Sequence, residues 1–179
     1  MKQKHSRVST LLTLALVAAL AGCASGVTRM DAPAGAAQAS APTKTVKSVS
    51  LWLNDDAKKL LPDNLKFNAD TLRSTVERAL SAHGVVKDDS TQQLDIEITS
   101  FRVRSNFSAI MFGFMAGNDN VEGIVTIKEA SGKALKRGKV SASYALGGIG
   151  GGQDEARMSW LYEEFAKHAA AEVLGNPVK

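Results

Sequence analysis

The chain has little of what most enzymes and metalloproteins need. Cys23 is the single cysteine among 179 residues, so no disulfide can form within the chain and core packing alone must hold the fold. There is no G-x-S-x-G, S-x-x-K or Gly-Lys-Ser/Thr motif. His168 follows Glu164 by four residues, which places both on one helix face, but no second metal ligand has a coherent spacing. We therefore expect no catalytic residue, no metal site and no cofactor, and hence a protein that is not an enzyme.

Net charge and long apolar runs are also scarce once the N-terminus is set aside. The chain carries 22 basic and 18 acidic residues, a net charge of +4. Lys2, Lys4 and Arg7 account for three of the basic residues, so the rest of the chain is nearly neutral, at 19 minus 18, or +1. This balance gives no basis for nucleic-acid binding. After the apolar run from Val8 to Leu20, no stretch reaches the roughly 20 apolar residues that a membrane-spanning helix needs.

The basic start, the apolar run and Leu20-Ala21-Gly22-Cys23 together resemble a bacterial lipoprotein signal. By this resemblance, residues 1–22 are a cleaved signal peptide, and Cys23 becomes the new N-terminus and carries covalent lipid. An uncleaved anchor helix is the alternative, but the small residues directly before Cys23 favour cleavage. Ala24 stands where an Asp would resemble an inner-membrane retention signal. The expected location is therefore the outer membrane, facing the periplasm, and the membrane is one partner through the lipid anchor.

Residues 23–45 have the composition of a tether. Ala24–Lys44 is rich in Ala, Ser, Pro and Gly and nearly free of large apolar side chains. Such a segment cannot bury enough surface to offset the entropy of ordering, so we expect a disordered linker. A flexible coil of roughly 20 residues has an r.m.s. reach of about 25 Å. Residues 46–179 then form a single periplasmic domain.

The domain shows strand and helix patterns in the order β-α-β-β-β-α. Alternating apolar residues predict strands over 46–53, 94–103, 121–127 and 140–146. The second pattern slips in phase at Thr99-Ser100, which predicts a β-bulge. Asn54-Asp55-Asp56 predicts a loop after the first strand. Helical spacing predicts helices over 68–83, from the N-cap Asn68 to Gly84, and over 154–174. We expect an α+β domain with an antiparallel sheet of about four strands and two helices on one face.

The most informative stretch of the domain is FSAIMFGFMA, residues 107–116. It joins two predicted strands, and a connection this apolar is unusual for a surface loop. One interpretation is a segment that folds back into the core. The other is an exposed patch that binds an envelope protein partner or the membrane. The candidate partner-binding residues in this stretch are Phe107, Ile110, Met111, Phe112, Phe114 and Met115.

A glycine-rich turn, residues 147–152, precedes the last predicted helix. Gly148 and Gly150 invite a phosphate-loop interpretation, because helix N-termini bind anions. Gln153 stands where the third glycine of a dinucleotide-binding motif belongs, and Asp154 and Glu155 would repel a phosphate. A strand-to-helix turn with close backbone packing is the simpler interpretation. We retain Gly148 and Gly150 as a second candidate contact with a partner.

The C-terminal half also carries a family resemblance. Its motifs are VSASYALGG at residues 140–148, Gln153-Asp154, Arg157-Met158, Trp160-Leu161-Tyr162 and Phe165-Ala166. This segment resembles a family of short Gram-negative lipoproteins known as a domain of unknown function (family 4410), and the resemblance covers most of the domain. More distantly, a lipobox, a linker and a small β-α-β-β-β-α unit are similar in layout to the lipopolysaccharide-assembly lipoprotein and to auxiliary lipoproteins of lipid-transporting ABC systems.

Together these features favour a non-enzymatic outer-membrane lipoprotein that binds or braces a partner in envelope assembly or transport. The alternative is a periplasmic module that carries a lipid or another small apolar ligand between its sheet and its helices. An envelope hydrolase has the least support, because the sequence offers it no nucleophile and base.

Overall fold

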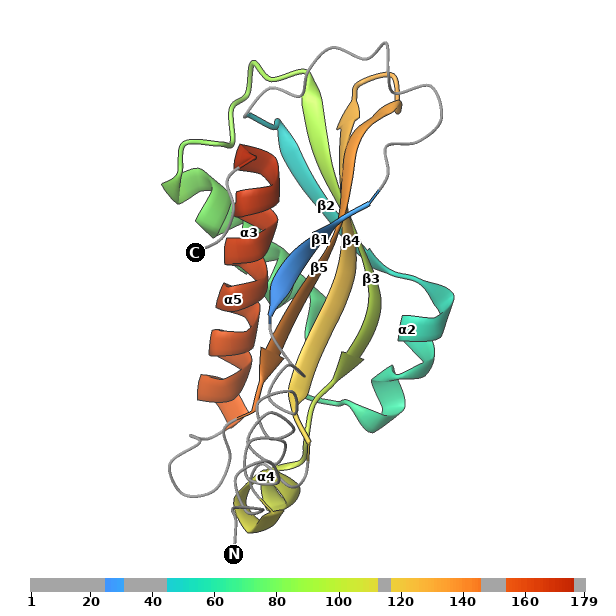
Figure 1. Ribbon diagram of the computed structural model, residues 1–179, viewed down its shortest axis with the longest axis vertical. Helices are drawn as coiled ribbons and strands as arrows, with labels where there is room; N and C mark the ends of the chain where they lie inside the picture. The colour runs from blue at the N-terminus through green and yellow to red at the C-terminus, as the bar shows by residue number, and fades with distance from the viewer. Residues whose placement is uncertain (1–24, 31–44, 113–116, 146–153, 176–179) are drawn as a thin grey trace, which may run out of the picture.

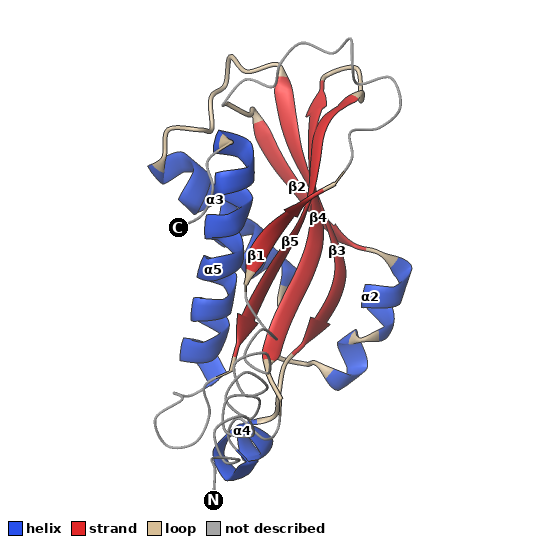
Figure 2. Cartoon of the chain, in the orientation of Figure 1, coloured by secondary structure: helices blue, strands red, loops and turns tan. Residues whose placement is uncertain are grey.

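A single five-stranded sheet forms the centre of the molecule. We describe a computed structural model, which covers residues 25–30, 45–112, 117–145 and 154–175. The strands lie in the order β1-β5-β4-β3-β2 (Figure 1). Their bounds are β1 Gly26–Arg29, β2 Ser48–Leu53, β3 Gln92–Arg102, β4 Asp119–Glu129 and β5 Ala134–Tyr144. Helices α3 (Ala69–Ala82) and α5 (Asp154–Leu174) pack against each other on one face of this sheet, as Figure 2 shows, so the predicted α+β class is confirmed.

The sheet is mixed, whereas the sequence predicts an antiparallel one. Strand β2 pairs in parallel with β3, and the other neighbours pair antiparallel. The chain leaves β2 and returns through α3 before it enters β3, and a crossover of this kind brings the second strand back in the same direction. The predicted bulge is confirmed, because the register of β3 against β4 shifts between Ile98 and Ser100.

A fifth strand lies within the segment predicted to be a disordered linker. Strand β1 pairs with the edge of β5, from Gly26 opposite Ser141 to Arg29 opposite Gly138. Val27 lies opposite Val140 and packs against the core. The linker prediction is therefore wrong for these four residues. A single valine among small and polar residues gives no strand pattern, but the open edge of β5 supplies the hydrogen-bonding partners for the backbone.

The two long helices form where the sequence predicts them. Asn68 caps α3 by accepting a hydrogen bond from the Thr71 amide at 2.8 Å, and Gly84 follows its end with a φ of +65°. The apolar faces of α3 and α5 meet the sheet in one continuous core. Its fully buried members include Leu72, Val76, Leu80, Leu94, Ile96, Ile98, Val121, Leu161, Phe165 and Ala169.

Two shorter α-helices form in segments that connect the predicted strands and helices. Helix α2 (Asp55–Lys59) follows β2, and Asn54 caps it by accepting from the Ala57 amide at 2.8 Å. The same Asn-Asp-Asp run that predicts a loop is thus the start of a helix, because Asn is a good N-cap and acidic residues favour the first turn. Helix α4 (Asn106–Phe112) lies between β3 and β4. Among the described residues, no helix is long and apolar enough to span a membrane.

Candidate functional site

Helix α4 projects from one end of the sheet and carries exposed apolar side chains. Phe107 is 67% exposed, Met111 63% and Phe112 56%, and we call these three residues the α4 patch. The rings of Phe107 and Phe112 meet edge-on, with centroids 6.3 Å apart. The interpretation of this stretch as core is therefore wrong for these three residues. The side chain of Ile110, together with Phe114, Met115, Gly148 and Gly150, lies outside the described residues.

The start of α4 is fixed by a serine. The Ser105 hydroxyl accepts a hydrogen bond from the Ser108 amide at 3.2 Å and donates to the Ser108 hydroxyl at 3.0 Å. This satisfies one of the amides that a helix N-terminus leaves unpaired. The helix sequence, NFSAIMF, has no charged residue. The chain therefore presents an uncharged helical turn to its surroundings.

A buried ionic cluster lies at the strand ends that flank α4. Asp119, the first residue of β4, accepts from the Arg104 backbone amide at 2.7 Å, and its carboxylate also meets the Arg104 guanidinium at 3.0 Å. Arg157 of α5 places its Nη1 3.5 Å from the same carboxylate and donates from Nη2 to the Arg104 carbonyl at 3.0 Å. All three side chains are almost completely buried. The cluster joins β3, β4 and α5 at the end of the sheet that carries α4.

The sequence patterns described above do not predict this cluster, although the position of Arg157 points to it. Arg157 stands four residues before Leu161 and eight before Phe165, and so falls on the apolar stripe of α5. A charged residue on a buried stripe needs a buried partner of opposite sign. The sequence does not reveal that the partner is Asp119, because the two residues come from different elements.

The N-terminal strand begins at the same end of the sheet. The Ser143 amide donates to the Ser25 hydroxyl at 2.8 Å, and this hydroxyl lies 3.4 Å from the Ser143 carbonyl. Ser143 pairs with Asn120, one residue after Asp119. The first described residue of the chain is therefore held beside the strand ends from which α4 projects.

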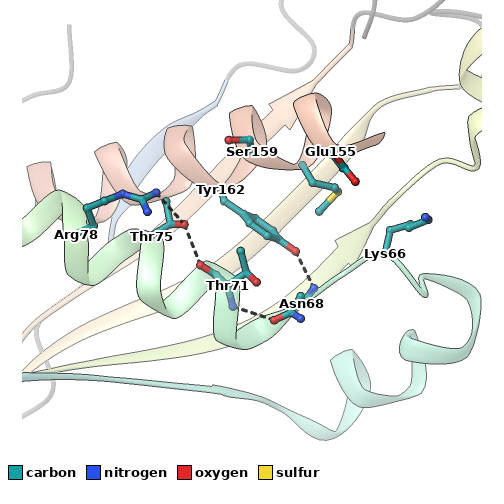
Figure 3. Close-up of a pocket in the computed structure, with 9 residues that line it drawn as sticks. Lys66, Asn68, Thr71, Thr75, Arg78, Glu155, Ser159 and Tyr162 are labelled. Atoms are coloured by element: carbon teal, nitrogen blue, oxygen red, sulfur yellow. Dashed lines mark hydrogen bonds between the residues drawn. The ribbon is translucent and has the colours of Figure 1, made fainter. Parts of the chain in front are cut away.

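A groove of about 320 Å³ lies between α3 and α5 (Figure 3). The Tyr162 hydroxyl accepts from the Asn68 amide at 2.7 Å, and burial raises the pKa of Tyr162 to about 12. Arg78 donates to the Thr75 hydroxyl at 3.5 Å, and Thr75 donates to the Thr71 carbonyl at 2.9 Å. These hydrogen bonds hold α3 together and tie its start to α5. They do not pair a nucleophile with a base.

His168 and Glu164 of α5 form the contact that their spacing predicts. The imidazole Nε2 lies 3.1 Å from a Glu164 carboxylate oxygen, and His168 is buried. Burial lowers the pKa of His168 despite the opposing effect of the Glu164 carboxylate. Within the described part of the chain, no group of three or more His, Cys, Asp or Glu side chains could hold a metal ion. The pair is thus a buried imidazole beside a carboxylate, without the further ligands that a metal site needs.

The face of the sheet opposite the long helices carries charges that pair with one another. Lys128 contacts Asp95 at 2.5 Å, and Lys139 contacts Glu122 at 2.7 Å. The Lys128 ammonium also lies 5.9 Å from the centroid of the Trp52 ring. Because Lys128 and Lys139 each have an acidic neighbour, the two lysines do not form a patch of unpaired positive charge. The α4 patch differs from it in being both uncharged and apolar.

Comparison with known protein families shows which family the chain belongs to. A family model described as a domain of unknown function, DUF4410, matches residues 27–148. The chain belongs to the DUF4410 family. The match begins inside β1 and ends just after β5. It therefore covers α4 and most of β1, the strand that the composition of its segment does not predict. A comparison with curated protein sequences found no match.

Solved structures of similar fold come from PelC of Paraburkholderia phytofirmans. A PelC variant, described as a dodecamer, is 14% identical over 86% of this chain and 99% of its own, with a TM-score of 0.50. A second PelC dodecamer is 12% identical over 83% of this chain and 97% of its own, with a TM-score of 0.48. A minor lipoprotein from Acinetobacter baumannii is 14% identical over 72% and 93% of the two chains, with a TM-score of 0.36. At 14% identity, the likeness to the first PelC structure shows the fold alone.

Proposed function

We propose that this DUF4410 protein is a lipid-anchored accessory protein of the outer membrane. It would face the periplasm and act by binding another component of the envelope. The lipobox ending at Cys23 supports the anchor, and the solved structures of similar fold include a chain described as a minor lipoprotein. The proposal does not call for a catalytic residue or a cofactor other than the covalent lipid on Cys23.

The observation that carries this proposal is the α4 patch. Exposed apolar clusters cost solubility and mark surfaces that become covered by a partner. The buried Arg104–Asp119–Arg157 cluster also fixes the strand ends on either side of α4. A rigid base lowers the entropy that binding must overcome. We therefore expect α4 to be the contacting surface.

Photo-crosslinking in intact cells tests this role. A photoreactive residue replaces Phe112, and in a matched control it replaces Ser131, which is exposed in the turn between β4 and β5. We expect adducts from position 112 that are absent from position 131. An adduct with a second copy of the chain would indicate self-association, as described for the PelC dodecamers. Equal adducts at both positions, or none, would contradict the role of α4.

Lipidation and location have their own test. The Cys23→Ser change should leave the signal uncleaved, and mass spectrometry of the unaltered protein should show acyl chains on residue 23. Separation of the inner and outer membranes on a sucrose gradient then reports the location. Recovery of the mature protein in the inner-membrane fraction would contradict the outer-membrane assignment.

A second candidate function is the binding of a small ligand in the groove between α3 and α5. Its volume of about 320 Å³ falls at the lower end of the range for ligand pockets. It is lined by both apolar and charged side chains, among them Met158, Arg78 and Lys66. Native mass spectrometry of the purified protein tests this function. A co-purified mass that is lost in an Arg78→Ala variant would support it, and a clean protein mass would count against it.

A further inference from the structure

The position of Ser25 limits how far the lipid can lie from the domain. Ser25 is bonded to Ser143 in β5, and only Ala24 separates it from Cys23. Two residues of fully extended chain span about 7 Å. The expected tether, with a reach of about 25 Å, is therefore absent between the lipidation site and the sheet. The lipid attached to Cys23 must enter the membrane close to the end of β5.

The register of the strands places α4 at that same end. Ser143 lies one residue before Tyr144, which pairs with Asp119 at the start of β4. Asp119 also holds Arg104, two residues before α4 begins at Asn106. The start of β1, the end of β5, the start of β4 and Arg104 thus lie at one end of the sheet, the end that carries α4 (Figure 1). The opposite end of the sheet carries the turn between β4 and β5.

From this juxtaposition we propose that the α4 patch contacts the leaflet that holds the lipid of Cys23. The inference rests on the proposed lipidation and names the bilayer as the partner of α4. Phe107, Met111 and Phe112 are exposed on a helix without charges, so nothing on α4 opposes its entry into the interface. Apolar helix faces that lie in the membrane interface sit about 5–10 Å into the boundary between headgroups and acyl chains, and we take this depth as the expectation for α4. The lipid supplies attachment, and α4 supplies a second point that fixes the orientation of the domain.

Two points of membrane contact fix the orientation of the domain, whereas one point does not. A single flexible anchor leaves the domain free to rotate, whereas a second apolar contact beside it holds one end of the sheet down. Strand β4 has 11 residues and is about 35 Å long. The turn that contains Ser131 would then stand about that far from the membrane, in water.

Spin labelling of the lipidated full-length mature protein in vesicles tests the proposal. The vesicles contain phosphatidylethanolamine and phosphatidylglycerol. Because the single native cysteine is acylated, Phe112→Cys or Ser131→Cys gives one free thiol for a nitroxide. The accessibility of each label to oxygen and to a water-soluble nickel complex reports its depth. We expect position 112 to lose access to the nickel complex and to lie about 5–10 Å below the headgroup level, while position 131 stays in water.

A second variant separates the contribution of α4 from that of the lipid. Phe107→Ser and Met111→Ser are added to the labelled Phe112→Cys protein, and both changes are at exposed positions where the fold does not depend on them. We expect the label to return to water although the lipid is still in the bilayer. A label at 112 that is as exposed to nickel as the one at 131 overturns the proposal. So does a label that stays in the bilayer after both serine changes, because the lipid alone would then explain its depth.

Failure here is distinguishable from failure of the proposed function. If position 112 lies in water on vesicles but crosslinks to a protein in cells, α4 binds a protein and the membrane contact is refuted. If it lies in water and gives no crosslink, both are refuted.

Discussion

Replacing Asp119 with Asn should cost a large part of the stability of the fold. The Asp119 carboxylate faces the guanidinium groups of Arg104 and Arg157, and all three side chains are at most 1% exposed. Removing one partner of a buried ion pair typically costs about 3–5 kcal/mol, because the remaining charge stays buried without its counter-charge. The amide oxygen of Asn can still accept from the Arg104 backbone amide, so we expect the lower end, about 3 kcal/mol. That is a large fraction of a total of about 5–15 kcal/mol.

Urea unfolding followed by circular dichroism measures this cost. With a slope of about 2 kcal/mol per molar urea, a loss of 3 kcal/mol lowers the midpoint by about 1.5 M. The matched control is Asp55→Asn, which removes an equally short contact with Lys58, at 2.9 Å, on an exposed helix turn. We expect no measurable shift there, because water screens that pair. Adding Arg157→Met should reduce the cost of Asp119→Asn, since one buried cation is then gone. Equal midpoints for the two Asp variants would refute the reasoning.

Three further predictions concern the core and its titrating groups. The Gly123→Ala change places a Cβ 3.2 Å from the ring of Phe165 and should cost about 1–3 kcal/mol in urea unfolding, whereas Gly26→Ala meets nothing within 4 Å and should be close to neutral. Because burial lowers the pKa of His168 from its ordinary 6.5, the unfolded chain binds that proton more tightly. The urea midpoint should therefore fall as pH drops from 6.5 through the lowered pKa, and His168→Gln should flatten the profile. Because the pKa of Tyr162 is raised to about 12, an ultraviolet titration should find Tyr162 still protonated at pH 11, and the free energy of unfolding should decrease between pH 10 and about 12.

The elements that the sequence predicts well are those whose periodicity is long and whose caps are strong. Helix α5 has the predicted bounds because its apolar stripe runs for 21 residues. Helix α3 begins after Asn68 and is followed by Gly84, as the capping residues indicate. The bulge at Ser100 is visible because a one-residue slip moves the apolar side chains from even to odd positions, and only an inserted residue keeps them on one face. In each case the signal is local.

The features that the sequence does not reveal depend on partners that are distant along the chain. Strand β1 exists because β5 offers an edge more than 110 residues later, as the Ser25–Ser143 hydrogen bond shows. The parallel pairing of β2 with β3 depends on how α3 packs. The exposure of Phe112 could not be decided from its neighbours, because an apolar run of ten residues fits a buried segment as well as an exposed one. The same stretch is nevertheless the candidate site that sequence analysis selects.

Strand β1, which the composition of its segment does not predict, changes which faces of the domain could meet a membrane. With a tether of about 20 disordered residues, any face of the domain could meet the membrane or point away from it. The exposure of a surface would then not indicate which of the candidate surfaces faces the membrane. With Ser25 bonded into the sheet, the lipid proposed on Cys23 would leave only from the end that carries α4. Under that proposal, the groove between α3 and α5 and the charged face of the sheet would stand beside the membrane rather than on it. The family match begins at residue 27, inside β1, so most of this short strand lies within the segment that the family model covers.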